Sequence, residues 1–162
     1  AFAAYDSCLQ WKDDNVMALN NYAYYLSEKG VDLHKAESMS YKTIKAEPNN
    51  GTYLDTYAWI LFMEERYADA KTYIDQALKN RDSTADNSTV LEHAGDIYYM
   101  NGMTDESVDF WKKAYTGENQ TEVLAWKIKN RQYITEEELK KRNAPKQKPA
   151  ATKKSVRKGK KK

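Results

Sequence analysis

Apolar and polar positions follow the period of an α-helix along most of the chain, in pairs of segments that recur. The first member of each pair reads Leu-x2-Tyr-Ala-x2-Leu or a close variant, and it begins at Leu19, Leu54 and Leu91. Large side chains three and four positions apart share one face of a helix. The pattern therefore predicts an all-α chain built from pairs of helices.

Small residues mark the places where the two helices of each pair are expected to cross. The pairs recur at intervals of 35 and 37 residues, measured between Tyr22, Tyr57 and Ala94. A helix pair packs closely only where short side chains meet. The predicted crossing residues of the first helices are Ala23, Ala58 and Gly95, and those of the second helices are Ala36, Ala70 and Ser107.

The turns inside the pairs carry helix-ending and helix-starting residues. Gly30 and Gly102 stand where the first helices should end in the left-handed backbone conformation, which glycine adopts without a steric cost. Asp32 and Thr104 follow them and are predicted to cap the next helices with their side-chain oxygens. These positions predict short turns within the first and third pairs.

Taken together, these residues resemble the tetratricopeptide (TPR) repeat family. The resemblance is strongest in residues 53–78, which carry Leu54, Tyr57, Ala58, Leu61, Tyr67, Ala70, Ile74, Ala77 and Leu78 at the family's positions. It implies an α-solenoid of helix-turn-helix repeats that acts as a non-catalytic scaffold for protein interactions. The implied repeats span residues 15–48, 49–82 and 83–119.

The ends of the chain extend the repeat pattern in both directions. Residues 1–14 match the second helix of a truncated upstream repeat, so we expect the chain to be a fragment of a larger protein. Residues 120–142 are predicted to form a capping helix that covers the last repeat, followed by a short charged helix. Thr135 and Glu138 fit the capping box that starts the short helix.

Charge separates the C-terminal end from the rest of the chain. Twelve of the 26 basic residues, and no acidic residue, fall within positions 140–162, which leaves 14 basic and 24 acidic residues in positions 1–139. Residues 143–162 also lack the large apolar side chains that offset the entropy cost of folding. We therefore predict a disordered Lys-rich tail beside a strongly acidic repeat body.

No motif of catalytic or cofactor-binding chemistry is found in the sequence. Phosphate-binding glycine loops, the Gly-x-Ser-x-Gly elbow, Cys-x2-Cys and His-Glu-x2-His are all missing. His34, His93 and Cys8 lie in different predicted units and do not have the spacing of a zinc site. We therefore predict no enzyme activity, no cofactor, no metal site and no small-molecule substrate.

The first helices are expected to line the concave side of the solenoid, where a partner segment would bind. The predicted partner-binding residues are Met17, Asn20, Tyr24, Asp55, Trp59, Phe62, Glu92, Asp96 and Tyr99, with Ser27, Met63 and Met100 beside them. Aromatic side chains and carboxylates together favour a protein or peptide with apolar anchors and positive charge. The alternative is that Tyr24, Trp59 and Phe62 only pack between adjacent repeats.

The charge of these faces also indicates which partners to exclude. The repeat domains that hold acidic C-terminal peptides use Lys, Arg and Asn on the same faces, whereas this chain offers Asn20 and carboxylates there. An acidic peptide would be repelled by Asp55, Glu92 and Asp96. A basic or amphipathic partner is therefore expected. The detailed pattern also resembles bacterial envelope-associated members of the family, which favours a periplasmic or outer-membrane-associated location over the cytoplasm.

The Lys-rich tail supports an alternative function. Weak, nonspecific contact with nucleic acid or an anionic membrane surface is expected from its basic cluster of Lys153, Lys154, Arg157, Lys158, Lys160, Lys161 and Lys162. The tail has no aromatic side chain that would stack on bases, so specific recognition of single strands is not predicted. Two simpler roles remain open, a solubilising tail and a tail that folds back onto the acidic repeats.

Overall fold

The computed structural model describes residues 15–146, and within this range the chain is helical with no strand. Its elements are α2 (Val16–Lys29), α3 (Leu33–Ala46), α4 (Gly51–Met63), α5 (Tyr67–Lys79), α6 (Ser88–Met100), α7 (Thr104–Ala114), the 3-10 turn η1 (Gly117–Asn119), α8 (Glu122–Asn130) and α9 (Glu136–Asn143). None of the described helices has the length and apolar character needed to cross a membrane.

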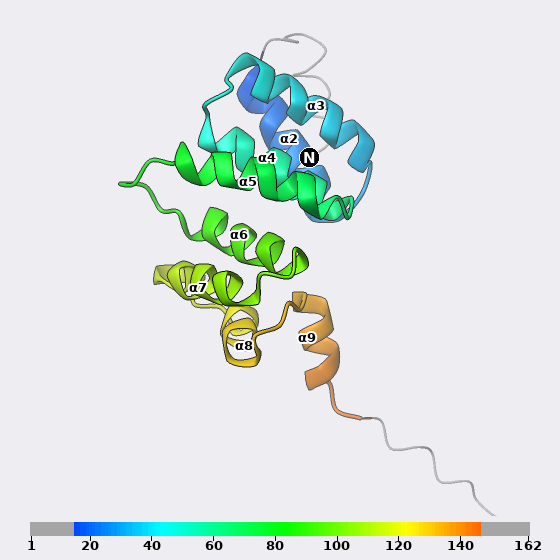
Figure 1. Ribbon diagram of the computed structural model, residues 1–162. Helices are drawn as coiled ribbons and strands as arrows, with labels where there is room; N and C mark the ends of the chain where they lie inside the picture. Colours follow the sequence, from blue (N-terminus) through cyan, green and yellow to red (C-terminus); the bar gives the residue numbers. More distant parts are fainter. Residues whose placement is uncertain (1–14, 147–162) are drawn as a thin grey trace, which may run out of the picture.

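The helices pair and stack in the order of the sequence (Figure 1). Helix α2 packs against α3, α4 against α5, and α6 against α7, and each pair contacts the next through α3 with α4 and α5 with α6. The first helices also touch one another, since α2 contacts α4 and α4 contacts α6. We call the surface that α2, α4 and α6 share the first-helix face. The predicted α-solenoid of helix-turn-helix repeats is confirmed.

The small residues predicted at the helix crossings are buried. The alanines Ala23, Ala36, Ala58 and Ala70 have no solvent-exposed surface, and neither does Ser107. Because a methyl group or hydrogen occupies little space, the paired helices approach closely at these points. Their burial is what the repeat pattern predicted.

Gly95 has a more specific role than the pattern indicated. A Cβ atom placed there would lie 2.3 Å from Cδ1 and 2.4 Å from Nε1 of Trp111 in α7. The indole therefore occupies the space that any other residue at position 95 would need. The third repeat thus pairs its smallest first-helix residue with a fully buried Trp111.

The helix ends follow the sequence prediction in part. Gly30 and Gly102 have φ values of 65° and 77°, so the predicted left-handed glycines are confirmed. The capping predictions for Asp32 and Thr104 are wrong. Asp32 precedes α3 but is itself left-handed, and its side chain makes no capping hydrogen bond. Helix α7 begins at Thr104, which places Met103 at the capping position.

Other side chains provide the caps that the helices need. Asn15, Asn50, Thr121 and Thr135 each accept a hydrogen bond from a backbone N–H in the first turn of α2, α4, α8 and α9. Such caps satisfy amide groups that have no partner inside the helix. The predicted start of α9 at Thr135 is confirmed, because its hydroxyl accepts from the Glu138 N–H.

The C-terminal segment folds onto the last repeat. Helix α8 packs against α7 and buries Leu124 completely, as expected of a capping helix. The loop after α8 and helix α9 bury Ile134 and Leu139. The predicted half-repeat at residues 1–14 lies outside the described residues, as do positions 147–162 of the predicted tail, whereas Asn143 is the last residue of α9.

Candidate functional site

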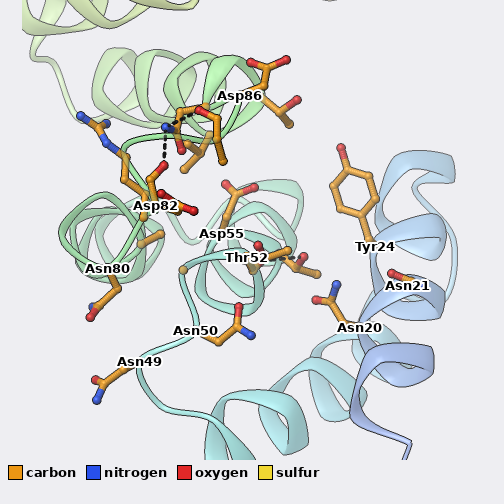
Figure 2. Close-up of a pocket in the computed structure, with 18 residues that line it drawn as sticks. Asn20, Asn21, Tyr24, Asn49, Asn50, Thr52, Asp55, Asn80, Asp82 and Asp86 are labelled. Atoms are coloured by element: carbon orange, nitrogen blue, oxygen red, sulfur yellow. Dashed lines mark hydrogen bonds between the residues drawn. The ribbon is translucent and has the colours of Figure 1, made fainter.

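A pocket of about 640 Å³ opens at the N-terminal ends of the first helices. It lies between α2, the turn that leads into α4, and the loop that joins α5 to α6 (Figure 2). Its lining residues are Asn20, Asn21, Tyr24, Asn49, Asn50, Gly51, Thr52, Asp55, Thr56, Ala77, Asn80, Arg81, Asp82, Ala85, Asp86, Asn87, Thr89 and Val90. Because six of these are asparagines, we call it the amide-rich pocket.

Three of the predicted partner-binding residues meet in the amide-rich pocket. Asn20 and Tyr24 reach it from α2, and Asp55 reaches it from α4. Asn20 is 5% exposed and its side-chain oxygen has no hydrogen-bond partner among the described residues. Burial and the nearby Glu28 and Asp55 carboxylates raise the pKa of Tyr24, so its hydroxyl stays protonated at neutral pH.

The Asp55 carboxylate forms a buried ion pair with the next repeat. Its Oδ1 atom lies 2.9 Å from Nδ1 of His93 in α6. Burial by itself would lower the pKa of His93, but the adjacent Asp55, together with Asp96 and Glu28, raises it above its ordinary value. The pair therefore links the second and third repeats beneath the pocket by a charge-assisted contact.

Trp59 and Phe62 form an aromatic stack with His93 on the first-helix face. The Trp59 ring lies 4.1 Å from the His93 ring and 4.6 Å from the Phe62 ring, measured between centroids, and both pairs are nearly parallel. Trp59 is only 9% exposed. Trp59 therefore packs between the second and third repeats, and Phe62 packs against it within the second. Neither side chain lines the amide-rich pocket.

The predicted carboxylates of the third repeat are neutralised within the chain. Nζ of Lys127 in α8 donates to Asp96 Oδ1 at 2.8 Å and to Glu92 Oε1 at 3.2 Å. The indole N–H of Trp111 also donates to Asp96 Oδ1, at 2.9 Å. Burial raises the pKa of Asp96 while Lys127 opposes the rise, and the two carboxylates raise the pKa of Lys127 despite its burial. Glu92 and Asp96 thus have a partner from the capping helix.

The capping segment also covers the aromatic end of the first-helix face. The Tyr133 ring, in the loop before α9, meets the Phe62 ring edge-on at a centroid distance of 5.6 Å. Nζ of Lys127 lies 5.3 Å from the centre of the Tyr133 ring. Tyr99 packs against Trp111, and Met17 is 64% exposed outside the pocket. Glu92, Asp96 and Tyr99 of the third repeat therefore do not line the amide-rich pocket.

Loop residues complete the pocket, and the sequence interpretation did not include them. The Asp82 carboxylate accepts from the backbone N–H and hydroxyl of Thr84, and the Asp86 carboxylate accepts from the Ser88 N–H. These hydrogen bonds lower the pKa of both carboxyl groups, which are therefore ionised at neutral pH. The one indication in the sequence was that the connection between the second and third repeats is polar. The structure places this loop beside α2 and α4, where it lines the pocket.

The amide-rich pocket is lined mainly by amides, hydroxyl groups and carboxylates. Among the described residues, no group of three or more His, Cys, Asp and Glu side chains is arranged to hold a metal ion. Asp55, Asp82 and Asp86 face a single cationic lining residue, Arg81. The lining therefore has a negative formal charge and a surplus of hydrogen-bond acceptors, which suits a cationic or N–H-bearing ligand.

Comparison with known proteins gives a sequence relative. No protein-family model matches the chain. A TPR repeat-containing protein from Pseudomonas aeruginosa is 35% identical over 66 residues, which make up 41% of this chain and 11% of that protein. The match therefore spans about a tenth of the relative's length.

Solved structures share the arrangement of helices. The first TPR domain of the human RPAP3 protein has a TM-score of 0.61 over 72% of this chain and 88% of that domain, at 13% identity. The N-terminal domain of stress-induced protein-1 from C. elegans has a TM-score of 0.55 over 73% of this chain and 94% of that domain, at 20% identity. Because both sequence identities are low, these comparisons show a shared fold and do not extend to function.

Proposed function

We propose that this chain, which has the tetratricopeptide-repeat fold, is a non-catalytic scaffold that captures a segment of a partner protein at the amide-rich pocket. The observation that carries the proposal is the position of that pocket on the first-helix face, where the repeats leave polar side chains uncovered. Solenoids of helical pairs use such a face to bind extended partners. The resemblance of the sequence to the TPR family implies the same kind of role.

The proposed partner segment is basic or amphipathic. The lining carries Asp55, Asp82 and Asp86 against Arg81, so an acidic segment would be repelled and a basic one attracted. Tyr24 is partly exposed at the pocket edge and offers an aromatic surface to an apolar side chain. This combination supports the preference inferred from the sequence.

The proposed binding surface comprises parts of the first two repeats, the loop after α5 and the first turn of α6. At the third repeat, Lys127 occupies the carboxylates of Glu92 and Asp96, and Tyr133 covers Phe62. A partner would have to displace these contacts to reach the whole first-helix face. The amide-rich pocket requires no such displacement.

Peptide selection on the intact protein tests the proposal. Short random peptides are displayed and selected on the parent chain, and the enriched sequences are synthesised and titrated by calorimetry. We expect enrichment of Lys or Arg beside apolar residues. Thr52 lines the pocket and is exposed, so Thr52→Lys should weaken these peptides by about tenfold or more through like-charge repulsion.

A matched substitution separates the pocket from the rest of the surface. Thr72 is an exposed residue of α5 that does not line the pocket, so Thr72→Lys adds the same charge elsewhere. It should leave peptide affinity nearly unchanged. Enrichment of acidic peptides, or equal losses in the two variants, would contradict the proposed function.

The sequence also predicts a polyanion contact through the Lys-rich tail, and this remains a separate proposal because its residues lie outside the described range. Removing residues 147–162 should abolish any binding to duplex DNA or to vesicles that contain phosphatidylserine. Binding by the parent should fall steeply with added salt, because phosphate contacts release counterions. Association that survived the deletion would reject the tail as its cause.

The proposed cellular location is the bacterial envelope. The resemblance of the repeat sequences to envelope-associated family members supports this proposal, and the Pseudomonas relative supports a bacterial setting. Fractionation of cells that produce the full-length protein tests it. Recovery only in the cytoplasmic fraction would contradict it.

A further inference from the structure

We propose that the amide-rich pocket contains a subsite for a primary ammonium group, formed by Asn20 and Asp55, that receives a lysine side chain of the captured partner. This inference rests on the proposed scaffold function and specifies the chemistry that the pocket recognises. It assigns a ligand group to a part of the first-helix face that the repeat pattern alone does not distinguish from its other polar positions.

The first observation is the state of the Asn20 side chain. It is 95% buried, and its carbonyl oxygen has no hydrogen-bond partner among the described residues. Figure 2 shows the carboxamide pointing from α2 into the pocket, toward Asn50 and Thr52. A buried acceptor without a donor is costly in a folded protein. The arrangement therefore leaves an acceptor available to a donor that enters from the pocket.

The second observation is the charge on the other sides of the pocket. Asp55 lies between Asn20 on one side and Asp82 and Asp86 on the other (Figure 2). The contact between Asp55 and His93 uses Oδ1 of the carboxylate. Asp82 and Asp86 are held by hydrogen bonds from their own loop. An ammonium group beside Asn20 would therefore lie near the charges of Asp82 and Asp86 and beside the Asp55 carboxylate, whose charge is shared with His93.

Cations of the chain itself are placed elsewhere. Lys127 is buried against Asp96 and Glu92 in the third repeat. Arg81 lines the pocket but is exposed and forms no salt bridge with the other residues of 15–146. Apart from the Asp55 pair with His93, the negative charge of the lining is thus left for a ligand. Lysine carries a compact ammonium with three donors, which suits an amide oxygen and a carboxylate together.

Titration with two blocked peptides tests the subsite on the full chain. The probes are acetyl-Ala-Gly-Lys-Gly-Ala-amide and the same peptide with an acetylated lysine, followed by NMR of the asparagine side-chain amides. We expect the lysine peptide to shift the Asn20 side-chain resonances and to bind about tenfold more tightly than the acetylated peptide, because charged hydrogen bonds are lost on acetylation.

Two substitutions at Asn20 are expected to change lysine binding without loss of the fold. Asn20→Leu removes the unpaired acceptor, so it should abolish the preference for lysine while leaving the unfolding midpoint at or above that of the parent. Asn20→Asp retains an acceptor and adds charge, so it should strengthen binding of the lysine peptide. Asn130→Leu, on the exposed end of α8, is the control and should retain the preference.

The subsite proposal is overturned if the two peptides bind equally, if Asn20→Leu retains the preference, or if Asn20→Asp weakens lysine binding. Its failure is distinguishable from that of the scaffold function. If selected peptides still depend on Thr52 but show no lysine preference, the scaffold function stands and the ammonium subsite is wrong. If selection on the parent yields no peptide at all, the scaffold function itself fails.

Discussion

Nδ1 of His93 lies 2.9 Å from Oδ1 of Asp55, although the two residues stand 38 positions apart and belong to different repeats. The side chains of both are almost fully buried, and Trp59 stacks on the imidazole ring. The attraction is strongest while the histidine is protonated, because the imidazolium and the carboxylate then carry opposite charges in a buried site. It therefore couples the packing of two repeats to pH.

We predict that this pair makes stability depend on pH from about 6.5 upward. The pKa of folded His93 is raised above its ordinary value of 6.5, whereas the unfolded chain keeps the ordinary value. The contribution of the pair to the free energy of unfolding is therefore fully present below the pKa of His93 in the unfolded chain. It is lost as the pH rises through the pKa of His93 in the folded protein. Urea unfolding between pH 6 and 9 should show a falling free energy of unfolding.

Substitution identifies the source of that dependence. Asp55→Asn removes the adjacent carboxylate and should flatten the slope, although Asp96, Glu28 and Tyr24 remain nearby. His34 is exposed on α3, so His34→Gln is the control and should keep the slope. An unchanged slope in Asp55→Asn would show that another group is responsible.

A second prediction concerns the contact between Gly95 and Trp111. Gly95→Ala should destabilise the protein by about 1–3 kcal/mol through overpacking, even though alanine favours helices more than glycine does. The cause is a steric clash, because the new Cβ would lie only 2.3 Å from Cδ1 of Trp111. Thermal and urea unfolding measure the loss.

The double variant Gly95→Ala with Trp111→Phe provides the check on that cause. A smaller ring should accommodate the methyl group, so the double variant should lose less stability than the sum of the single losses. Thr89→Ala, at an exposed position of the same helix, should be neutral or slightly stabilising. Strict additivity of the two losses would argue against the packing explanation.

The buried Lys127 is predicted to be essential for the third repeat. Lys127→Met leaves the Asp96 carboxylate without its cation in a buried site and should cost about 3–5 kcal/mol. Because the pKa of Asp96 is already raised by burial, protonation should relieve part of this cost. The loss should therefore be smaller at pH 5 than at pH 8.

A surface lysine supplies the comparison. Lys140 pairs with Glu136 on the exposed side of α9. Lys140→Met should leave the free energy of unfolding nearly unchanged, because exposed ion pairs contribute little. Similar losses in the two lysine variants would mean that burial of the Lys127 pair is not what stabilises the third repeat.

The structure predicts that Trp59→Ala destabilises the fold. Trp59 is among the partner-binding residues predicted from the sequence. Its ring is buried between Phe62 and His93, so the substitution should cost about 3–5 kcal/mol, as other large core truncations do. Circular dichroism during thermal unfolding measures this loss, and an unaltered midpoint would show that the ring is dispensable for packing.

Much of the architecture could be predicted because it depends on local pattern. The spacing of Leu54, Tyr57 and Leu61 defines one helical face, and all three are buried as expected. Gly30 ends its helix in the left-handed conformation for a reason that belongs to the residue itself. Helix caps were less predictable. Asp32 is a residue type that commonly caps helices, but its left-handed backbone is not accompanied by a capping hydrogen bond from its side chain.

The candidate site was predictable only in part. Asn20, Tyr24 and Asp55 could be selected because the repeat pattern places them on the first-helix face, and all three line the pocket. Asp82 and Asp86 were missed, since a loop without helical periodicity gives no indication of which helices it will meet. The return of Tyr133 to Phe62 was equally invisible, because the two residues are 71 positions apart.

The sequence by itself determined the period, the helix pairs and the small residues that allow them to nest, because each of these follows from steric demands within a few turns of chain. The tertiary structure decided which carboxylates are neutralised and which stay open to a ligand. Lys127 reaches Asp96 and His93 reaches Asp55 only after the repeats have stacked. Charge pairing depends on distances in space, and those distances are set by the packing of whole helices.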